Sequence, residues 1–160
     1  MADVTKFLDE AGVDFDLLEH EHTERAADEA KALDVAAEEV AKTLVLASPS
    51  GNVRAVLPAS ERIDVGKVAD LLEAAHKEVH LATEDDMKRD YPDFDLGAVP
   101  PFGGKEGDRV IIDVRLAERD SIVLEAGSHE RSVRLKSVDL VRLTQAQVAD
   151  ICKIEERTAR

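Results

Sequence analysis

A turn between two apolar segments constrains the fold of this chain more than any other feature. Residues 40–47 and 53–57 are strand-like, and the intervening Ser48-Pro49-Ser50-Gly51-Asn52 is made of turn-forming residues. Proline fixes φ and glycine tolerates positive φ, so this segment can reverse the direction of the chain. The pattern predicts an antiparallel hairpin, which argues against a sheet made only of parallel strands.

Further short strands and helices are interleaved along the chain. Strands are expected at residues 15–20, 79–81, 110–114, 121–124 and 132–135. Helices are expected at residues 3–11, 23–33, 64–75, 83–92, 138–143 and 145–154. Thr23, Asp64 and Thr83 are expected to cap their helices, because a hydroxyl or carboxylate oxygen accepts from a free backbone N–H. Since no regular βαβ alternation appears, we predict an α+β fold: a single domain with a mixed, mostly antiparallel, curved sheet flanked by helices.

The length and composition fit one intracellular domain. The chain has 160 residues, 44% of them hydrophobic but only 3% aromatic, so its core must be built from Val, Leu, Ile and Ala. We expect the domain to cover residues 1–154 and a polar C-terminal tail to follow at 155–160. Cys152 is the single cysteine and is expected to be an apolar residue on the C-terminal helix. Without a disulfide pattern, a signal peptide or a run of ~18 apolar residues, the chain is expected in the cytoplasm and outside the membrane.

Acidic residues dominate the charge balance. Asp and Glu number 35 against 21 Lys and Arg, which gives a formal net charge of −14. Such a surface repels the phosphates of nucleic acid unless salt screens its field, whose reach is ~3 Å at about 1 M salt. Two interpretations stay open: the protein never meets nucleic acid, or it works in very high salt. The acidic, Ala-rich and Lys-poor composition is typical of a salt-adapted protein.

Residues 97–103 (GAVPPFG) form the most unusual segment. The two prolines lock consecutive φ angles, and the glycines permit positive φ and close approach of a partner. The N–H groups of Ala98, Val99, Phe102 and Gly103 could face outward together and bind a carbonyl or anionic oxygen. On the residues alone, a rigid turn between a helix and a strand is the simpler interpretation.

Two charged residues interrupt apolar strands. Alternation places Lys42 on the same strand face as Leu44 and Leu46. Because a buried ammonium is costly unless it is paired, Lys42 is either a cation held in a pocket or an edge-strand lysine that reaches water, and the residues favour neither. Asp113 ends another apolar run, where it either satisfies local backbone groups or orients a site residue; the first is the more common.

Other chemical motifs are weak or missing. His129 lies in a turn between strands, where a histidine can titrate or form hydrogen bonds near neutral pH. His20 and His22 have no third ligand at metal-binding spacing, so we expect no metal site. The sequence contains no nucleophile-elbow serine, no phosphate-binding loop and no dinucleotide-binding glycine motif, so we expect no cofactor.

Several segments, taken together and in order, resemble the YbaK/prolyl-tRNA synthetase-associated family of aminoacyl-tRNA editing domains. They are His22-Thr23 before an Ala-rich helix, VAKTLV at 40–45, VLP at 56–58, GAVPPFG at 97–103, Ile112-Asp113 and AGSH at 126–129. The resemblance covers roughly residues 14–143. Its most specific part is the glycine–proline loop paired with an upstream strand lysine.

The resemblance implies an enzyme that hydrolyses the ester of a mischarged aminoacyl-tRNA without metal or cofactor, using a bound water and the substrate's own ribose hydroxyl. It implies a small amino acid on tRNA-Pro or a related tRNA as substrate. The aminoacyl-tRNA acceptor end would be the partner, and an aminoacyl-tRNA synthetase is a candidate further partner. The implied catalytic residues are Lys42, Gly97 and Pro101. The implied substrate-binding residues are Thr23, Thr43, Ala98, Val99, Gly103, Asp113 and His129.

Three hypotheses of different classes follow. The first is a trans-acting deacylase in which loop N–H groups bind the developing oxyanion and Lys42 positions a phosphate or the ester. The second is a non-catalytic module that binds an aminoacyl or nucleotide group in the same pocket. The third is an acidic interaction protein without a small-molecule site. A deacylase with this charge would contact tRNA only at the acceptor end, through Lys42, Arg54, Arg62 and Lys105, or would need high salt.

Overall fold

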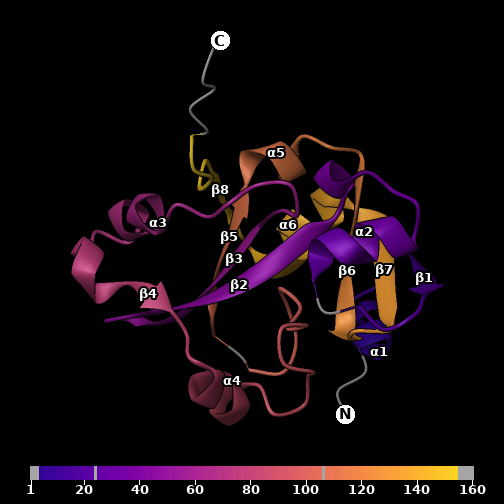
Figure 1. Ribbon diagram of the computed structural model, residues 1–160, viewed down its shortest axis with the longest axis horizontal. Helices are drawn as coiled ribbons and strands as arrows, with labels where there is room; N and C mark the ends of the chain where they lie inside the picture. Colours follow the sequence, from indigo (N-terminus) through magenta and orange to yellow (C-terminus); the bar gives the residue numbers. More distant parts are fainter. Residues whose placement is uncertain (1–3, 24, 106, 155–160) are drawn as a thin grey trace.

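The computed structural model describes residues 4–23, 25–105 and 107–154. The strands form two sheets, and helices lie around them (Figure 1). The predicted α+β class, with mixed and mostly antiparallel strand pairing, is confirmed. The predicted polar tail at 155–160 lies outside the described residues.

The larger sheet has five strands in the order β4-β2-β3-β5-β8. These strands are β2 (Ala41–Ser48), β3 (Gly51–Pro58), β4 (His80–Leu81), β5 (Arg109–Asp113) and β8 (Gln147–Ala149). β2 and β3 form the expected antiparallel hairpin, and β5 and β8 add to it in parallel. Because β4 pairs only with Leu46 and Ala47, the described strands leave the first half of β2 as an edge.

The smaller sheet is antiparallel and has the strand order β1-β7-β6. Its strands are β1 (Phe15–Glu19), β6 (Ser121–Ser128) and β7 (Arg131–Lys136), and the last two extend beyond the predicted ranges. A bulge interrupts the β6–β7 ladder between Glu125 and Ser128. A parallel bridge between Val40 and Val123 joins the two sheets just before β2 begins.

The helices are short, and some of them begin at a residue whose side chain caps the backbone. They are α1 (Val4–Glu10), α2 (Ala26–Ala32), α3 (Val65–Leu71), α4 (Glu84–Asp90), α5 (Val114–Ala117) and α6 (Ser137–Thr144), with 3-10 turns at Ala37–Glu39 and His76–Glu78. The Asp64 carboxylate accepts from the Lys67 N–H, and Thr83 and Asp86 cap each other's backbone, so both predicted caps are confirmed. No helix in the described part of the chain is long and apolar enough to cross a bilayer.

Apolar clusters fill the space on both sides of β2. One cluster joins α1, the smaller sheet and residues such as Val99 to the β2 face that carries Val45. Another packs Val68 of α3 against the opposite face, which carries Leu46. The alternation predicted along β2 is therefore correct, and successive side chains of this strand enter different cores.

Two local predictions are wrong. The predicted helix at 145–154 contains β8 instead, and Cys152 forms a bridge with Ile63 rather than lying on a helix. Thr23 does not cap α2, whose N-cap position is Arg25; the Thr23 N–H and hydroxyl donate to the His129 carbonyl at 2.9 and 3.4 Å. In both places, a contact with a distant segment outweighs the local helix signal.

Candidate functional site

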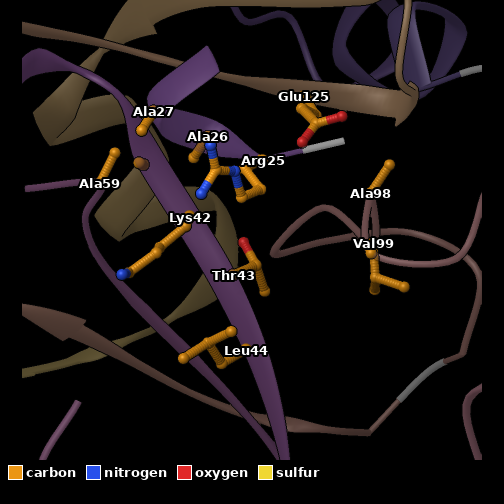
Figure 2. Close-up of a pocket in the computed structure, with 12 residues that line it drawn as sticks. Arg25, Ala26, Ala27, Lys42, Thr43, Leu44, Ala59, Ala98, Val99 and Glu125 are labelled. Atoms are coloured by element: carbon orange, nitrogen blue, oxygen red, sulfur yellow. The ribbon is translucent and has the colours of Figure 1, made fainter. Parts of the chain in front are cut away.

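A pocket of about 450 Å³ opens where several parts of the chain meet. Its main walls are the start of α2, the edge of β2 and the loop that connects α4 with β5, and single residues after β3 and from β6 complete it (Figure 2). The lining residues are Arg25, Ala26, Ala27, Ala41, Lys42, Thr43, Leu44, Ala59, Gly97, Ala98, Val99 and Glu125. This size suits a group as large as a nucleoside or a small ligand.

The first half of β2 presents both of its faces to the pocket. In Figure 2, Thr43 points toward the loop that carries Ala98 and Val99, whereas Lys42 and Leu44 point to the other side of the strand. Both sides border one pocket because this stretch of β2 is an edge among the described strands. Lys42 and Thr43 are therefore presented to different parts of a bound molecule.

Lys42 is a half-buried cation at this edge. Burial lowers the pKa of its ammonium, and the nearby Cys152, Arg62 and Glu61 have smaller influences. The two interpretations of Lys42 left open by the sequence both apply, since the residue lies on an edge strand and lines a pocket. A cation that has lost part of its hydration binds a phosphate or carbonyl oxygen more strongly than it would in bulk water.

Arg54 of β3 holds the loop from inside. Its buried guanidinium donates to the loop carbonyls of Pro100 at 2.9 Å, Gly103 at 2.8 Å and Lys105 at 3.0 Å. Three carbonyls that converge on one rigid, planar cation fix the backbone between them. The conformation of residues 97–103 therefore depends on Arg54 as well as on the two prolines.

Asp108 and Tyr91 complete the surroundings of Arg54. The Arg54 Nε donates to Asp108 Oδ2 at 3.0 Å, and the guanidinium carbon lies 4.9 Å from the centre of the Tyr91 ring. The Tyr91 hydroxyl donates to the same carboxylate. Burial and, to a smaller extent, this hydrogen bond raise the pKa of Tyr91 to about 12. With 1% of its surface exposed, Arg54 cannot be the tRNA contact that the sequence suggested.

The loop segment that faces the pocket begins at Gly97. This glycine has a φ of +85°, and a Cβ there would lie 3.6 Å from the His129 ring. The Ala98 N–H donates to the Asp95 carbonyl at 2.9 Å, so it is not the outward donor that the sequence predicted. The N–H groups of Gly97 and Val99 have no hydrogen-bond acceptor among the described residues and are the remaining candidate donors.

His129 braces the loop instead of lining the pocket. Its Nε2 lies 2.7 Å from the Leu96 carbonyl oxygen, and its Nδ1 lies 3.0 Å from Glu125 Oε2. Its backbone N–H donates to the Asp95 carboxylate at 3.2 Å. Thr23 binds the carbonyl of His129, so both predicted substrate contacts lie just behind the pocket wall.

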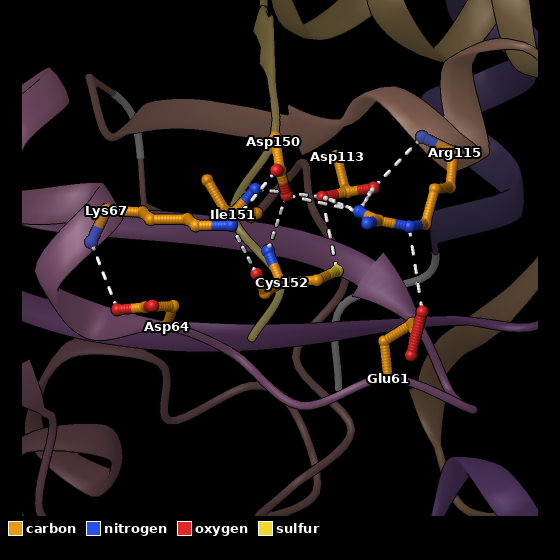
Figure 3. Close-up of polar contacts among 8 residues, drawn as sticks. All are labelled: Glu61, Asp64, Lys67, Asp113, Arg115, Asp150, Ile151 and Cys152. Atoms are coloured by element: carbon orange, nitrogen blue, oxygen red, sulfur yellow. Dashed lines mark hydrogen bonds and ion pairs between the residues drawn. The ribbon is translucent and has the colours of Figure 1, made fainter. Parts of the chain in front are cut away.

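Asp113 belongs to a separate polar cluster (Figure 3). Its fully buried carboxylate accepts from the Arg115 and Ile151 backbone N–H groups, both at 2.9 Å, and from the Cys152 thiol at 3.2 Å. Burial and the contact with Asp113 raise the pKa of Cys152 to about 12. Asp113 thus caps α5 and ties it to the segment after β8, which is the structural interpretation, and it does not line the pocket.

The structure brings half of the predicted site residues together. Those that line the pocket are Lys42, Thr43, Gly97, Ala98 and Val99. Those outside the lining are Thr23, Pro101, Gly103, Asp113 and His129. Pro101 is buried within the loop, and Gly103 contributes its carbonyl to Arg54. Gly103 and His129 hold the loop from behind, whereas Asp113 stabilises a separate cluster.

Sequence reasoning missed two charged residues of the pocket, Arg25 and Glu125. Glu125 ends an apolar run in the way that Asp113 does, so the signal that singled out Asp113 could have found it. Arg25 carries no such signal, because its position depends on how α2 packs beside β2.

Comparisons with known proteins agree on one family. A model described as the aminoacyl-tRNA editing domain matches residues 20–143. The multifunctional Ser/Thr-tRNA deacylase ProXp-y of Escherichia coli is 26% identical over 148 residues, which cover 89% of this chain and 87% of that protein.

Solved structures share the fold at low sequence identity. One is described as a candidate trans-editing enzyme for prolyl tRNA synthetase, and it matches with a TM-score of 0.85 at 24% identity over 94% of this chain and 95% of its own. Another, a hypothetical protein, has the same TM-score and identity and covers 94% of this chain and 99% of its own.

Proposed function

Because this chain belongs to the family of aminoacyl-tRNA editing domains, we propose that its pocket hydrolyses the ester bond of a mischarged aminoacyl-tRNA. Water adds to the ester carbonyl, the bond to the ribose oxygen breaks, and free amino acid and tRNA are released. The observation that carries this proposal is the shared pocket of Lys42 and the loop residues Gly97 to Val99, with the loop held rigid by Arg54.

The loop would stabilise the charge that develops during the reaction. Attack on the carbonyl carbon places a negative charge on its oxygen, and the N–H groups of Gly97 and Val99 can donate to that oxyanion. A good donor of this kind contributes about 3 kcal/mol to the barrier reduction, provided that it is already in position. An ester is activated enough that no side-chain nucleophile is needed.

Lys42 would bind a different part of the substrate. Its ammonium lies on the far side of β2 from the loop in Figure 2, so we assign it to a phosphate or ribose oxygen of the terminal nucleotide. Arg25 lines the same pocket and supplies a second cation for this anionic end. Both cations would attract this end of the substrate at short range, where the more distant acidic residues behind the net charge of −14 weaken the attraction least.

The substrate is a small amino acid on tRNA-Pro or a related tRNA. The small-amino-acid assignment is supported by the name of the Escherichia coli relative, a Ser/Thr-tRNA deacylase. The tRNA assignment rests on the family resemblance alone. The size of the pocket would then select among amino-acid side chains. This selection is modest, because one methylene changes the free energy of transition-state binding by only about 1–3 kcal/mol.

A deacylation panel tests the proposal. The purified chain is incubated with tRNAs charged with Ala, Ser, Thr, Cys or Pro, and release of amino acid is followed in dilute buffer and in about 1 M KCl. Lys42→Ala should lower kcat/KM by about 100-fold. Lys77→Ala changes an exposed lysine outside the pocket and should leave the rate unchanged.

The outcomes separate the competing functions. Release of one amino acid with full activity in Lys42→Ala would remove Lys42 from the mechanism while keeping the deacylase. Tight binding of charged tRNA without release from any of them would favour the non-catalytic binding module.

A further inference from the structure

The first half of β2 is an edge among the described strands, and it borders the pocket. β3 pairs along one side of β2, but on the other side β4 reaches only Leu46 and Ala47. Before β2 begins, the smaller sheet meets the chain through the isolated bridge between Val40 and Val123. No described strand therefore pairs with this side of β2 at Thr43, which lines the pocket.

The hydrogen bonds around β2 show which backbone groups point to this side. On the β3 side, the Val40 carbonyl accepts from the Ala59 N–H at 2.8 Å. On the β4 side, the Val45 carbonyl accepts from the Ala82 N–H at 2.9 Å. Successive residues of an antiparallel strand direct their backbone groups to opposite sides in turn. Thr43, two residues before Val45, therefore directs both its N–H and its C=O away from β3, toward the free edge.

The side chains around this edge leave room for a flat group. Five of the twelve lining residues are alanines, and they come from four parts of the chain: Ala26 and Ala27 of α2, Ala41 of β2, Ala59 after β3, and Ala98 of the loop (Figure 2). Methyl groups make apolar walls and take up little space. A pocket with such walls and one main-chain donor beside one acceptor suits a planar ring with a polar edge.

Adenine, the terminal base of every tRNA, has the matching edge. Its N6 amino group is a donor, and the neighbouring ring nitrogen is an acceptor. The backbone of Thr43 offers the reverse pair, and main-chain groups of an edge strand bind extended ligands in the same way. Hypoxanthine, the base of inosine, instead presents an O6 acceptor beside an N1–H donor. Each of these groups would meet a like group on Thr43 and leave it unpaired.

We propose that the N–H and C=O of Thr43 bind the edge of the terminal adenine, so that the edge of β2 selects the nucleotide that carries the amino acid. This inference rests on the proposed function and adds to it a specificity for the last base. Base, phosphate and aminoacyl ester all extend from one ribose, and three sides of the pocket can hold them: Thr43 the base, Lys42 the phosphate, and the loop at Gly97 the ester carbonyl.

A binding experiment compares a base that fits with one that does not. The probes are 3′-threonylamino-3′-deoxyadenosine 5′-phosphate, whose amide resists hydrolysis, and its inosine counterpart. The unchanged chain should bind the adenosine probe about 10- to 100-fold more tightly. In NMR spectra, the Thr43 amide proton should shift downfield with the adenosine probe only, because that probe alone accepts from it. Equal affinities, or binding of neither probe, overturn the inference.

Two substitutions separate the backbone of Thr43 from its side chain. Thr43→Pro removes the N–H, and an edge strand tolerates proline where this group faces away from the partner strand. Its preference for the adenosine probe should fall to about twofold or less. Thr43→Val removes the hydroxyl, keeps the N–H and should keep the preference. A preference retained in Thr43→Pro contradicts the inference, and the amide shift of the unchanged chain decides the matter if that variant does not fold.

Turnover separates this inference from the proposed function. Threonyl-tRNA with its natural terminal adenosine is compared with threonyl-tRNA whose last nucleotide is inosine. If the unchanged chain hydrolyses both at the same rate, the deacylase stands and the base recognition fails. If neither is hydrolysed but the adenosine probe binds with the expected preference and amide shift, the base recognition stands and the deacylase fails.

Discussion

Glu29 of α2 is a carboxyl group enclosed in the interior. It is fully buried, the Ser132 hydroxyl donates to its Oε2, and its Oε1 has no hydrogen-bond partner in the part of the chain that the structure describes. His20 lies next in the same cluster, with its Nε2 2.9 Å from the Ser132 hydroxyl. Burial raises the pKa of Glu29 to about 7, against the smaller opposing influence of the hydrogen bond from Ser132. The helix that carries the pocket wall is thus docked through a carboxyl group that keeps its proton up to near neutral pH.

Glu29 should make stability depend on pH in a defined direction. The folded chain keeps the proton up to about pH 7, whereas the unfolded chain releases it near 4.5. Unfolding therefore releases a proton between these values, and the stability contributed by Glu29 falls as pH rises through them. Glu29→Gln mimics the protonated form, so its stability relative to the unchanged chain should rise by about 3 kcal/mol from about pH 5 to pH 8. Urea denaturation of both proteins measures this; parallel pH dependences would contradict it.

The loop between α4 and β5 owes its shape to a residue on another element. Prolines restrict residues 97–103, but the carbonyls of Pro100, Gly103 and Lys105 turn toward Arg54 on β3. The start of the same segment is held by Asp95, whose backbone N–H donates to the Gly127 carbonyl at 2.9 Å. The element that would bind the reacting oxygen is therefore fixed from both sheets.

Arg54→Met should collapse this loop. The change leaves the buried Asp108 carboxylate without its guanidinium partner and removes the donor from three carbonyls, which should cost about 3–5 kcal/mol. Arg89→Met, which removes the ion pairs of an exposed arginine with Asp86 and Asp90, should cost about 1 kcal/mol or less. Chemical denaturation compares the free energies of unfolding of the two variants. At a temperature where both remain folded, only Arg54→Met should lose deacylation activity. Similar losses of stability in both variants would contradict the assigned role.

At the scale of the whole molecule, charge is the dominant property. The net charge of −14 on 160 residues disfavours the compact state through repulsion between like charges. Many of the described ion pairs are exposed, as between Arg25 and Asp28, and compensate little of it. We propose that the chain is adapted to high salt, where repulsion is screened over a few ångströms.

Salt should stabilise the protein and support its activity. The thermal midpoint should rise by about 5–10 °C between dilute buffer and about 1 M KCl, and deacylation should persist in the concentrated salt. Sucrose at matched water activity serves as the control for a general solute effect. A midpoint that does not change with KCl would count against adaptation to salt.

Features encoded within a few residues were determined by the sequence itself. The hairpin turn at 48–52 and the caps at Asp64 and Thr83 depend on neighbours along the chain, and the structure contains all of them. The face of β2 that carries Lys42 followed from alternation alone. These predictions succeeded because sterics and short-range hydrogen bonds act on the chain before it folds.

Tertiary structure decided which charged residues form the site and which support it. Arg54, Asp113 and Lys42 all interrupt apolar strands, yet only Lys42 reaches the pocket. Their separate roles depend on partners far away in sequence: the loop carbonyls for Arg54 and the segment after β8 for Asp113. β8 was mistaken for a helix for the same reason, since pairing with β5 outweighed its local pattern. A buried charge is placed by the groups that compensate it, and those groups come together only when the chain folds.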